Sequence, residues 1–513
     1  MSEPVLLIPL DDRPVTYHLP RQIGAIAGVE VLCPPLELMG NLERPANVEG
    51  LLEWLTEHAP KAQAAIVSVD TLGYGGLIPS RQSEAPLAVI QERLARLVKI
   101  KEAKPSLPLY GFSVTMRLSA EAAVEEEKPY WAQYGKRIYQ YSYHQDRYEQ
   151  HGDAADLQAA LDAKGEVPFE ILSDYLETRE RNLTINQMMV EWTRRNLFDL
   201  LLMTQDDTSR YGLNVKEQRK LAEQVQAAGL GNRVLLYPGA DEVASVLVGR
   251  HLNRVKRQSP AFCVRYSTPY GGTVTPMYED RPLERTIASQ IQAVGGRVVG
   301  SLQEADVLLM VNTPSTGQGD LALRIHLDKV DHPPRDLAPF ARTLNESLMP
   351  TALADVAYAN GGDPELFRAF KDYLRLCAFA AWNTAGNTLG TVVAQASAWL
   401  DPATRDEAAQ RQYMLDRIAD DVLYQSQLRP QLQEERARGR SIEDLERELP
   451  ERLLALWARL VHRVPVAAVE ARFPWHRLFE VGVHVVERQP GNGDLQSTSQ
   501  DQALEASDRH PAV

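Results

Sequence analysis

Short runs of apolar residues recur along this chain of 513 residues, each bounded by glycine or polar residues and separated by segments with helical spacing. In the first half these runs are Val5–Leu10, Val29–Cys33, Ala64–Val69, Leu107–Val114, Leu200–Thr204 and Val234–Tyr237. Strands of a parallel sheet have this continuous apolar character, because helices cover both faces of the sheet. The pattern therefore predicts βα units and an α/β fold.

A second set of runs predicts a second sheet: Phe262–Tyr266, Arg297–Gly300, Val307–Asn312, Ala352–Ala357 and Ala378–Asn383. We therefore predict two doubly wound, Rossmann-like lobes, residues 1–257 and 258–396, with a TIM-barrel-like first lobe as the alternative. Residues 397–487 are rich in Arg, Glu, Leu and Ala at helical spacing, which predicts a helical C-terminal region. The polar residues 488–513 contain no aromatic side chain and are expected to be disordered.

The charge balance excludes some classes of partner. Lys and Arg number 55 against 69 Asp and Glu, a net charge of −14, and no basic run occurs. Duplex nucleic acid and anionic membranes need clustered cations, so neither is an expected partner. The N-terminus has no basic segment before its apolar residues, and no stretch is long enough to span a bilayer. With three widely separated cysteines, these features predict a cytoplasmic protein, while its oligomeric state stays open.

Charged and glycine residues follow the predicted strands at their carboxyl ends. In parallel α/β folds these ends form one rim, where ligands bind. The candidates in the first lobe are Asp11, Asp12, Arg13, Asp70, Tyr74, Arg81, Arg117, Asp206, Asp207, Asp241 and Glu242. In the second lobe Trp382, Asn383 and Asn387 follow the last strand, and a flat apolar ring beside amide groups suits a sugar.

Adjacent acids are the sharpest of these signals. Two neighbouring carboxylates at a buried rim repel each other, so one must be protonated, paired or bound to a metal. Each candidate also has a structural alternative. The Asp241-Glu242 pair fits the cap of a following helix, and Trp382 fits a core position. The three arginines either pair with the acids or bind an anionic group.

Familiar cofactor motifs are absent. The glycines of Gly73–Gly76 do not have the GxGxxG spacing, and neither GxxxxGK[ST] nor HExxH occurs. We therefore predict no nucleotide cofactor and no zinc site. An all-oxygen Mg²⁺ or Mn²⁺ site built from Asp11, Asp70 and Asp206 is an open alternative.

Six motifs together resemble a bacterial family catalogued as a domain of unknown function. They are IPLDDRP, VDTLGYGGLIPSR, TQDDTSRYG, PGADE, MYEDRP and AWNTAGNTLG, and the resemblance spans most of residues 4–395. Such a family carries no mechanism, so the chemistry must be argued from the residues.

A shorter stretch, LLLMTQDDTSRYG, is similar to glycosidases that remove N-acetylglucosamine by substrate-assisted catalysis. The resemblance implies that Asp206 orients the substrate acetamido group and that Asp207 protonates the leaving oxygen. Asp241 and Glu242 are an alternative pair for the same two roles. Since the acetamido oxygen replaces an enzyme nucleophile, the scheme needs only these two carboxyl groups.

The sequence thus predicts a glycoside hydrolase acting on a small carbohydrate, a glycoside of a 2-acetamido sugar, without a cofactor. In this interpretation the rim acids and the Trp382-Asn383-Asn387 group bind hydroxyls, and the arginines meet any anionic substituent. One alternative is a Mg²⁺- or Mn²⁺-dependent hydrolase or lyase acting on an anionic metabolite. The other is a two-lobed sugar-binding protein without catalysis.

Overall fold

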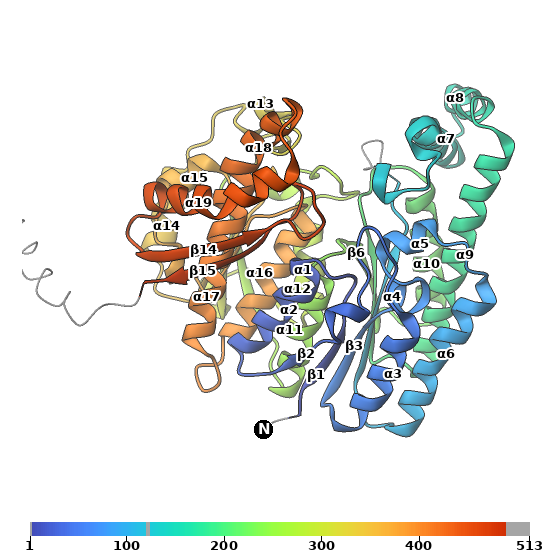
Figure 1. Ribbon diagram of the computed structural model, residues 1–513, viewed down its shortest axis with the longest axis horizontal. Coiled ribbons are helices and arrows are strands. Elements are labelled where there is room, and N and C mark those ends of the chain that lie inside the picture. The colour runs from blue at the N-terminus through green and yellow to red at the C-terminus, as the bar shows by residue number, and fades with distance from the viewer. Residues whose placement is uncertain (1–2, 119–123, 489–513) are drawn as a thin grey trace, which may run out of the picture.

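The computed structural model describes residues 3–118 and 124–488, and its first lobe is built on a parallel sheet of six strands (Figure 1). In chain order the strands are β1 (Val5–Ile8), β2 (Val31–Leu32), β3 (Ala64–Ser68), β4 (Leu109–Thr115), β5 (Leu200–Gln205) and β6 (Val234–Pro238). Their order across the sheet is β2-β1-β3-β4-β5-β6. Every residue of β1, β3, β4 and β5 is buried, as helices on both faces require.

The second lobe repeats this topology. Its strands are β7 (Ala261–Tyr266), β8 (Arg297–Val299), β9 (Val307–Asn312), β11 (Thr351–Asp355) and β13 (Ala378–Ala380). They form a parallel sheet in the order β13-β11-β9-β7-β8. In both sheets the strand order reverses beside the first strand, which is the doubly wound arrangement. The prediction of two parallel-sheet lobes is confirmed, and the first sheet is open, with β2 and β6 at its edges, rather than a barrel.

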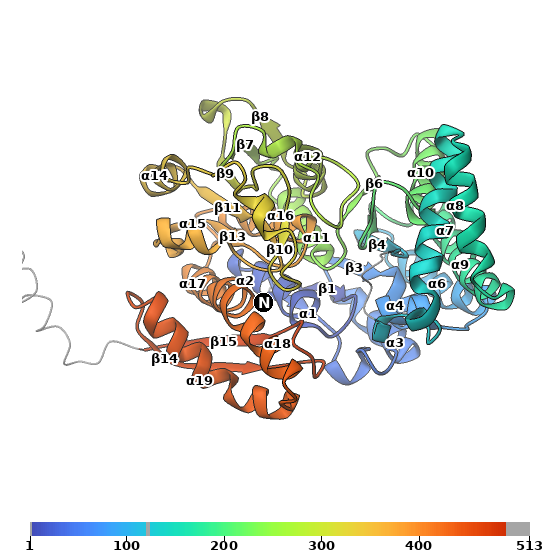
Figure 2. The same ribbon diagram turned by 90° about the horizontal axis from the view of Figure 1, so that it is seen from above.

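One layer of helices is shared by the two sheets. It contains α2 (Leu19–Ile26), α11 (Val243–Val255), α12 (Leu283–Ala293) and α16 (Ala385–Trp399), which lie between the sheets in Figure 2. α12 contacts both β6 and β8, and α16 contacts α11 as well as β11 and β13. Residues 385–398 of α16 are all buried, because a helix packed on every side has no solvent face.

The outer faces carry separate helices. The first sheet is covered on its outer side by α3 (Val48–His58), α6 (Leu87–Ala103), α9 (Phe169–Arg194) and α10 (Leu213–Ala227). The second sheet is covered by α14 (Ala338–Glu346) and α15 (Pro364–Ala369). No helix within the described ranges is long and apolar enough to cross a bilayer.

The C-terminal region begins with helices, as the sequence predicts. α17 (Glu407–Arg417) continues through a π-helical segment, Ile418–Leu428, into α18 (Arg429–Ala437), and α19 (Ile442–Leu460) follows. An antiparallel hairpin of β14 (Val466–Arg472) and β15 (Gly482–Glu487) then lies beside α17 and α19, in red in Figure 2. The sequence analysis does not anticipate this hairpin. The proposed disordered tail, apart from Arg488, lies outside the described residues.

The packing of α16 on α11 allows a direct test. A Cβ atom on Gly390 would stand 2.3 Å from Cγ of Glu242, which is fully buried at the start of α11. We expect Gly390→Ala to lower the free energy of unfolding by about 1–3 kcal/mol, because an overpacked core must shift to accept the methyl group. Urea unfolding measures the change.

Gly165 provides the control for this substitution. It is the last residue of α8 (Ala154–Gly165), and a Cβ atom there meets nothing within 4 Å. Gly165→Ala should leave stability unchanged or slightly raised. A Gly390→Ala protein as stable as the wild type would contradict the close contact between α16 and α11.

Candidate active site

A pocket of about 550 Å³ is lined by residues that lie near the carboxyl ends of strands in both lobes. The first lobe lines it with Arg13, Arg117, Asp206, Asp207 and Asp241, and the second lobe with Tyr278, Asp320, Asn360 and Asn383. The C-terminal region completes the wall with Arg429, Arg436, His476, Arg477 and Phe479. Open α/β sheets bind ligands at this edge, so the pocket is the candidate active site.

Arg13 connects the loop after β1 with the loop after β6. Its Nη2 lies 2.7 Å from Oδ2 of Asp11 and 2.7 Å from Oδ1 of Asp241, and all three side chains are buried. Asn383 of the second lobe donates to Oδ2 of Asp241 over 3.0 Å, and Oδ1 of Asn387 accepts from the Asp241 amide over 3.2 Å. Burial raises the pKa of Asp241 to about 6, although Arg13 opposes the shift. The two lobes therefore meet at one carboxylate.

Glu126 contacts three guanidinium groups on another wall of the pocket. Its Oε2 lies 3.2 Å from Arg81 and 2.9 Å from Arg117, and its Oε1 lies 2.7 Å from Arg477. Arg117 also donates from Nε to Glu127 over 2.8 Å. The three cations hold the pKa of Glu126 well below its usual range, against the effect of burial. The sequence analysis names neither glutamate, because neither follows a strand directly.

Asp206 and Asp207 directly follow β5, and their side chains have different environments. Arg81 donates to Oδ2 of Asp206, and the Asp207 amide donates to Oδ1 of Asp206 over 3.1 Å. Burial and the neighbouring Asp206 carboxylate raise the pKa of Asp207 to about 7, although Arg117, 3.5 Å away, opposes the shift. Both side chains keep some exposure, 18% for Asp206 and 24% for Asp207. The pair therefore presents one arginine-bound carboxylate and one easily protonated carboxyl group to the pocket.

Eight of the predicted site residues do not line the pocket, among them Asp11, Asp12, Arg81 and Asn387, and the other four are buried in the fold. Asp70 accepts from the Val114 amide over 2.9 Å, and burial raises its pKa to about 7. Tyr74 is buried, with its ring under the Arg181 guanidinium. Glu242 accepts from Gln290 over 2.7 Å, and burial raises its pKa to about 8. Trp382 lies in the core and donates to Oγ1 of Thr391 over 3.3 Å.

A stack of alternating arginines and aromatic rings forms the third wall. The Trp475 ring lies between Arg13 and Arg477, with each Cζ about 5 Å from its centroid, and Phe479 lies between Arg477 and Arg429 at 5.3 and 4.7 Å. Trp475 also donates from Nε1 to Oδ1 of Asp12 over 2.6 Å. Such contacts stabilise a guanidinium held over a ring face. The sequence analysis misses this stack, although FPWHRLFE interleaves aromatic and basic residues.

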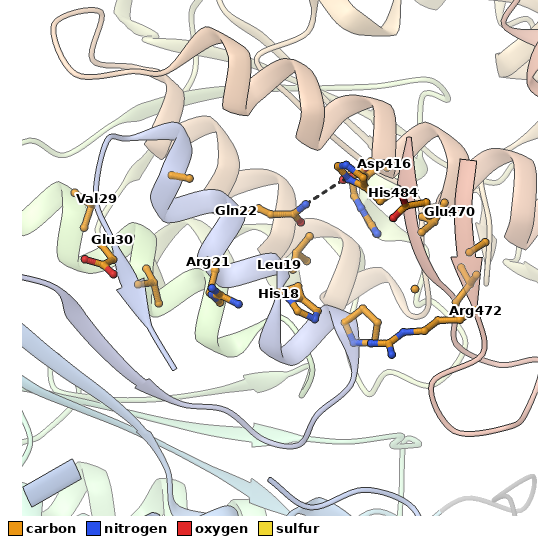
Figure 3. A pocket seen from close by; sticks show the side chains of 18 residues that line it. His18, Leu19, Arg21, Gln22, Val29, Glu30, Asp416, Glu470, Arg472 and His484 are labelled. Atoms are coloured by element: carbon orange, nitrogen blue, oxygen red, sulfur yellow. Dashed lines mark hydrogen bonds and ion pairs between the residues drawn. The ribbon is translucent and has the colours of Figure 1, made fainter. Parts of the chain in front are cut away.

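A larger cavity, about 720 Å³, lies apart from this site, between α2 and the hairpin (Figure 3). His18, Arg21 and Gln22 come from the N-terminal side, and Arg472 and His484 from the hairpin. Gln22 donates to Oδ2 of Asp416 over 3.1 Å, the contact drawn in Figure 3. None of the predicted site residues lines this cavity.

Metal ligands are not assembled in the described ranges. Within residues 3–118 and 124–488, no three His, Cys, Asp or Glu side chains are grouped closely enough to hold an ion. Asp11, Asp70 and Asp206 in particular do not form the cation site that the sequence left open.

Fold and site together define a class: a two-lobed, doubly wound α/β protein with a cleft of paired carboxylates and arginines. The chain belongs to the family described as "Protein of unknown function (DUF4127)", whose sequence model matches residues 5–484. The resemblance noted in the sequence is thereby confirmed. The match includes the loop that carries Trp475, Arg477 and Phe479. No curated protein and no solved structure matches the chain.

Removing the cation between Asp11 and Asp241 should destabilise the fold. In Arg13→Met two buried carboxylates lose their partner, and we expect a loss of about 3–5 kcal/mol in the free energy of unfolding at pH 8. The loss should shrink at pH 5, because a proton can then neutralise Asp241, whose pKa burial raises to about 6. Urea unfolding at the two pH values measures both effects.

Arg411 offers a matched control, because its pair with Glu487 is largely exposed. Arg411→Met should change stability by no more than about 1 kcal/mol at either pH. An equal, pH-independent change in both variants would contradict the role given to Arg13.

Proposed function

We propose that this protein is a glycoside hydrolase that acts on a small glycoside of a 2-acetamido sugar. The observation that carries the proposal is the Asp206-Asp207 pair, which lies in a pocket lined by both lobes and joins a carboxylate bound to Arg81 with a carboxyl group of raised pKa. Substrate-assisted hydrolysis needs these two groups, one to orient the acetamido group and one to donate a proton.

The proposed reaction assigns each carboxyl group one role. Asp206 accepts the acetamido N–H, which directs the acetamido oxygen at the anomeric carbon. As that oxygen forms its bond, the glycosidic bond breaks, and Asp207 gives its proton to the departing oxygen. Water then attacks the anomeric carbon and opens the cyclic intermediate, while Asp207 takes a proton back. Protein, substrate and one water molecule supply every atom, so no cofactor enters this scheme.

The second lobe supplies polar groups suited to sugar hydroxyls. Asp320 is fully buried at the pocket and accepts from Tyr278 over 2.8 Å and from Asn360 over 2.9 Å. Asn383 lies against Asp241 from the opposite side. Phe479 offers the apolar surface expected of Trp382, which lies in the core. A carbohydrate ligand needs this mixture of amide, carboxylate and ring surfaces.

Two alternatives have less support. A metal-dependent hydrolase needs a group of ligands that the described residues do not assemble. A binding protein has no need of carboxyl groups with raised pKa values, whereas Asp207 and Asp241 both have them. Incubation with a chelator separates the metal-dependent enzyme from the proposed one, which should keep its full activity. The three cysteines are free and buried, which fits the proposed cytoplasmic location.

Replacing the proposed acid tests the function most directly. Chromogenic α- and β-N-acetylhexosaminides are assayed with the wild type and with Asp207→Asn. We expect kcat/KM to fall about 10²–10⁴-fold in the variant, and to fall further for alkyl than for nitrophenyl leaving groups, because a poor leaving group depends more on the proton. Asp280→Asn is the control, since Asp280 pairs with Arg281 and does not line the pocket. No turnover of any of these glycosides by the wild type, or unchanged turnover in Asp207→Asn, contradicts the proposal.

The pH profile follows from the same group. Because the pKa of Asp207 is about 7 instead of 3.8, the acid form is present below about pH 7 and is lost above it. We expect kcat/KM to fall about tenfold per unit above that pH. The contribution of Asp207 to stability has the same direction, full below its unfolded pKa and lost as the pH rises towards 7. Urea unfolding of Asp207→Asn between pH 5 and 8 should therefore lack this decline, and an identical decline in the variant contradicts the assignment.

A further inference from the structure

Arg429 is a buried arginine without a carboxylate partner. It lines the pocket at the start of α18 and is only 5% exposed. Its Nη1 donates to Oε1 of Gln425 over 2.8 Å, whereas its buried Nε has no hydrogen-bond partner. In the part of the chain that the structure describes, no carboxylate lies within 4 Å of its guanidinium. Burial without a counter-charge lowers the pKa of Arg429.

The other guanidiniums that line the buried wall are paired. Arg13 contacts Asp11 and Asp241, Arg117 contacts Glu126, and Arg477 contacts both Glu126 and Glu480. These cations cannot bind an added anion without breaking ion pairs. The sequence-based expectation that arginines meet an anionic substituent therefore moves from Arg13, Arg81 and Arg117 to Arg429.

The nearest acids are already occupied. Asp320 accepts hydrogen bonds from Tyr278, Asn360 and the Leu323 amide. Glu480 is held by Arg477. Neither carboxylate is free to turn towards Arg429 without giving up these bonds, and an unpaired buried charge is costly to the fold.

Arg436, two helical turns further along α18, adds a second cation to the same side of the pocket. It is exposed, and its Nη1 donates to the Arg440 carbonyl over 2.8 Å. Residues i and i+7 of a helix share a face, so both guanidiniums lie on the pocket side. The pocket wall therefore carries two positive charges that form no ion pair with a carboxylate of the described residues.

We propose that Arg429, assisted by Arg436, binds an oxyanion group of the ligand, so that the substrate is a glycoside with an anionic substituent. The identification of the ligand as a glycoside rests on the proposed function, whereas the oxyanion site rests on Arg429 itself. Carboxylate and phosphate share the chemistry that a guanidinium recognises, two acceptor oxygens that take parallel hydrogen bonds. The bound anion would be the negatively charged partner that Arg429 lacks among the described residues.

The test compares binding by titration calorimetry at low salt. The probes are N-acetylglucosamine, N-acetylglucosamine 6-phosphate, glucuronic acid and inorganic phosphate, and the proteins are the wild type, Arg429→Gln and Arg411→Gln. We expect at least one anionic probe to bind the wild type about tenfold or more tightly than N-acetylglucosamine. Arg429→Gln should lose that preference, and Arg411→Gln should keep it. The phosphate and carboxylate probes separate the two sources of the oxyanion.

Thermal unfolding without ligand separates binding from a structural role. Removing an unpaired buried charge should leave the melting temperature of Arg429→Gln at or above that of the wild type, in contrast to Arg13→Met. Phosphate should raise the melting temperature of the wild type and not that of Arg429→Gln. A strongly destabilised Arg429→Gln protein, no preference of the wild type for any anion, or an unchanged preference in the variant overturns the proposal.

The two proposals fail separately. If an anion binds in an Arg429-dependent way but no N-acetylhexosaminide is hydrolysed, the glycosidase proposal is contradicted and the oxyanion site is supported. If wild type and Arg429→Gln hydrolyse neutral glycosides at the same rate and neither binds anions, the oxyanion site is contradicted and the glycosidase proposal is supported.

Discussion

The ion pair between Arg13 and Asp241 is the contact on which the rest of the site depends. It connects the loops after β1 and β6, which lie 228 residues apart in the chain. Asp241 in turn accepts a hydrogen bond from Asn383 of the second lobe. One buried carboxylate thus fixes the first strand, the sixth strand and the second sheet relative to one another, and the Arg13 guanidinium is the charge that makes its burial tolerable.

Pairing of buried carboxylates with arginines also stabilises the pocket wall around Glu126. Glu126 sits among Arg81, Arg117 and Arg477, and two of these arginines reach onward to Asp206 and Asp207. The network leaves Asp206 with a close cation and Asp207 with a more distant one. The raised pKa of Asp207 beside an arginine-bound Asp206, rather than the mere presence of two acids, is what supports the proposed acid–base roles.

Much of the fold was predictable because strands buried on both faces leave an uninterrupted apolar record in the sequence. The hairpin of β14 and β15 has no such continuous apolar run, since it packs on one face and is largely exposed on the other. Several site residues that follow strands of the two main sheets were predicted, whereas Glu126, Arg429 and Arg477 follow no strand of either sheet directly. Adjacent residues also diverge: Asp241 lines the pocket and Glu242 enters the core, which sequence spacing cannot distinguish.

The shared layer of α2, α11, α12 and α16 has a consequence for how a ligand gets in. Two lobes can hinge apart only if the interface between them tolerates exposure to solvent, but residues 385–398 of α16 are all buried. Opening the cleft by moving one sheet from the other would expose that whole helix to water. Such an opening is therefore costly, and we expect the two sheets to move together as one body around the binding surface.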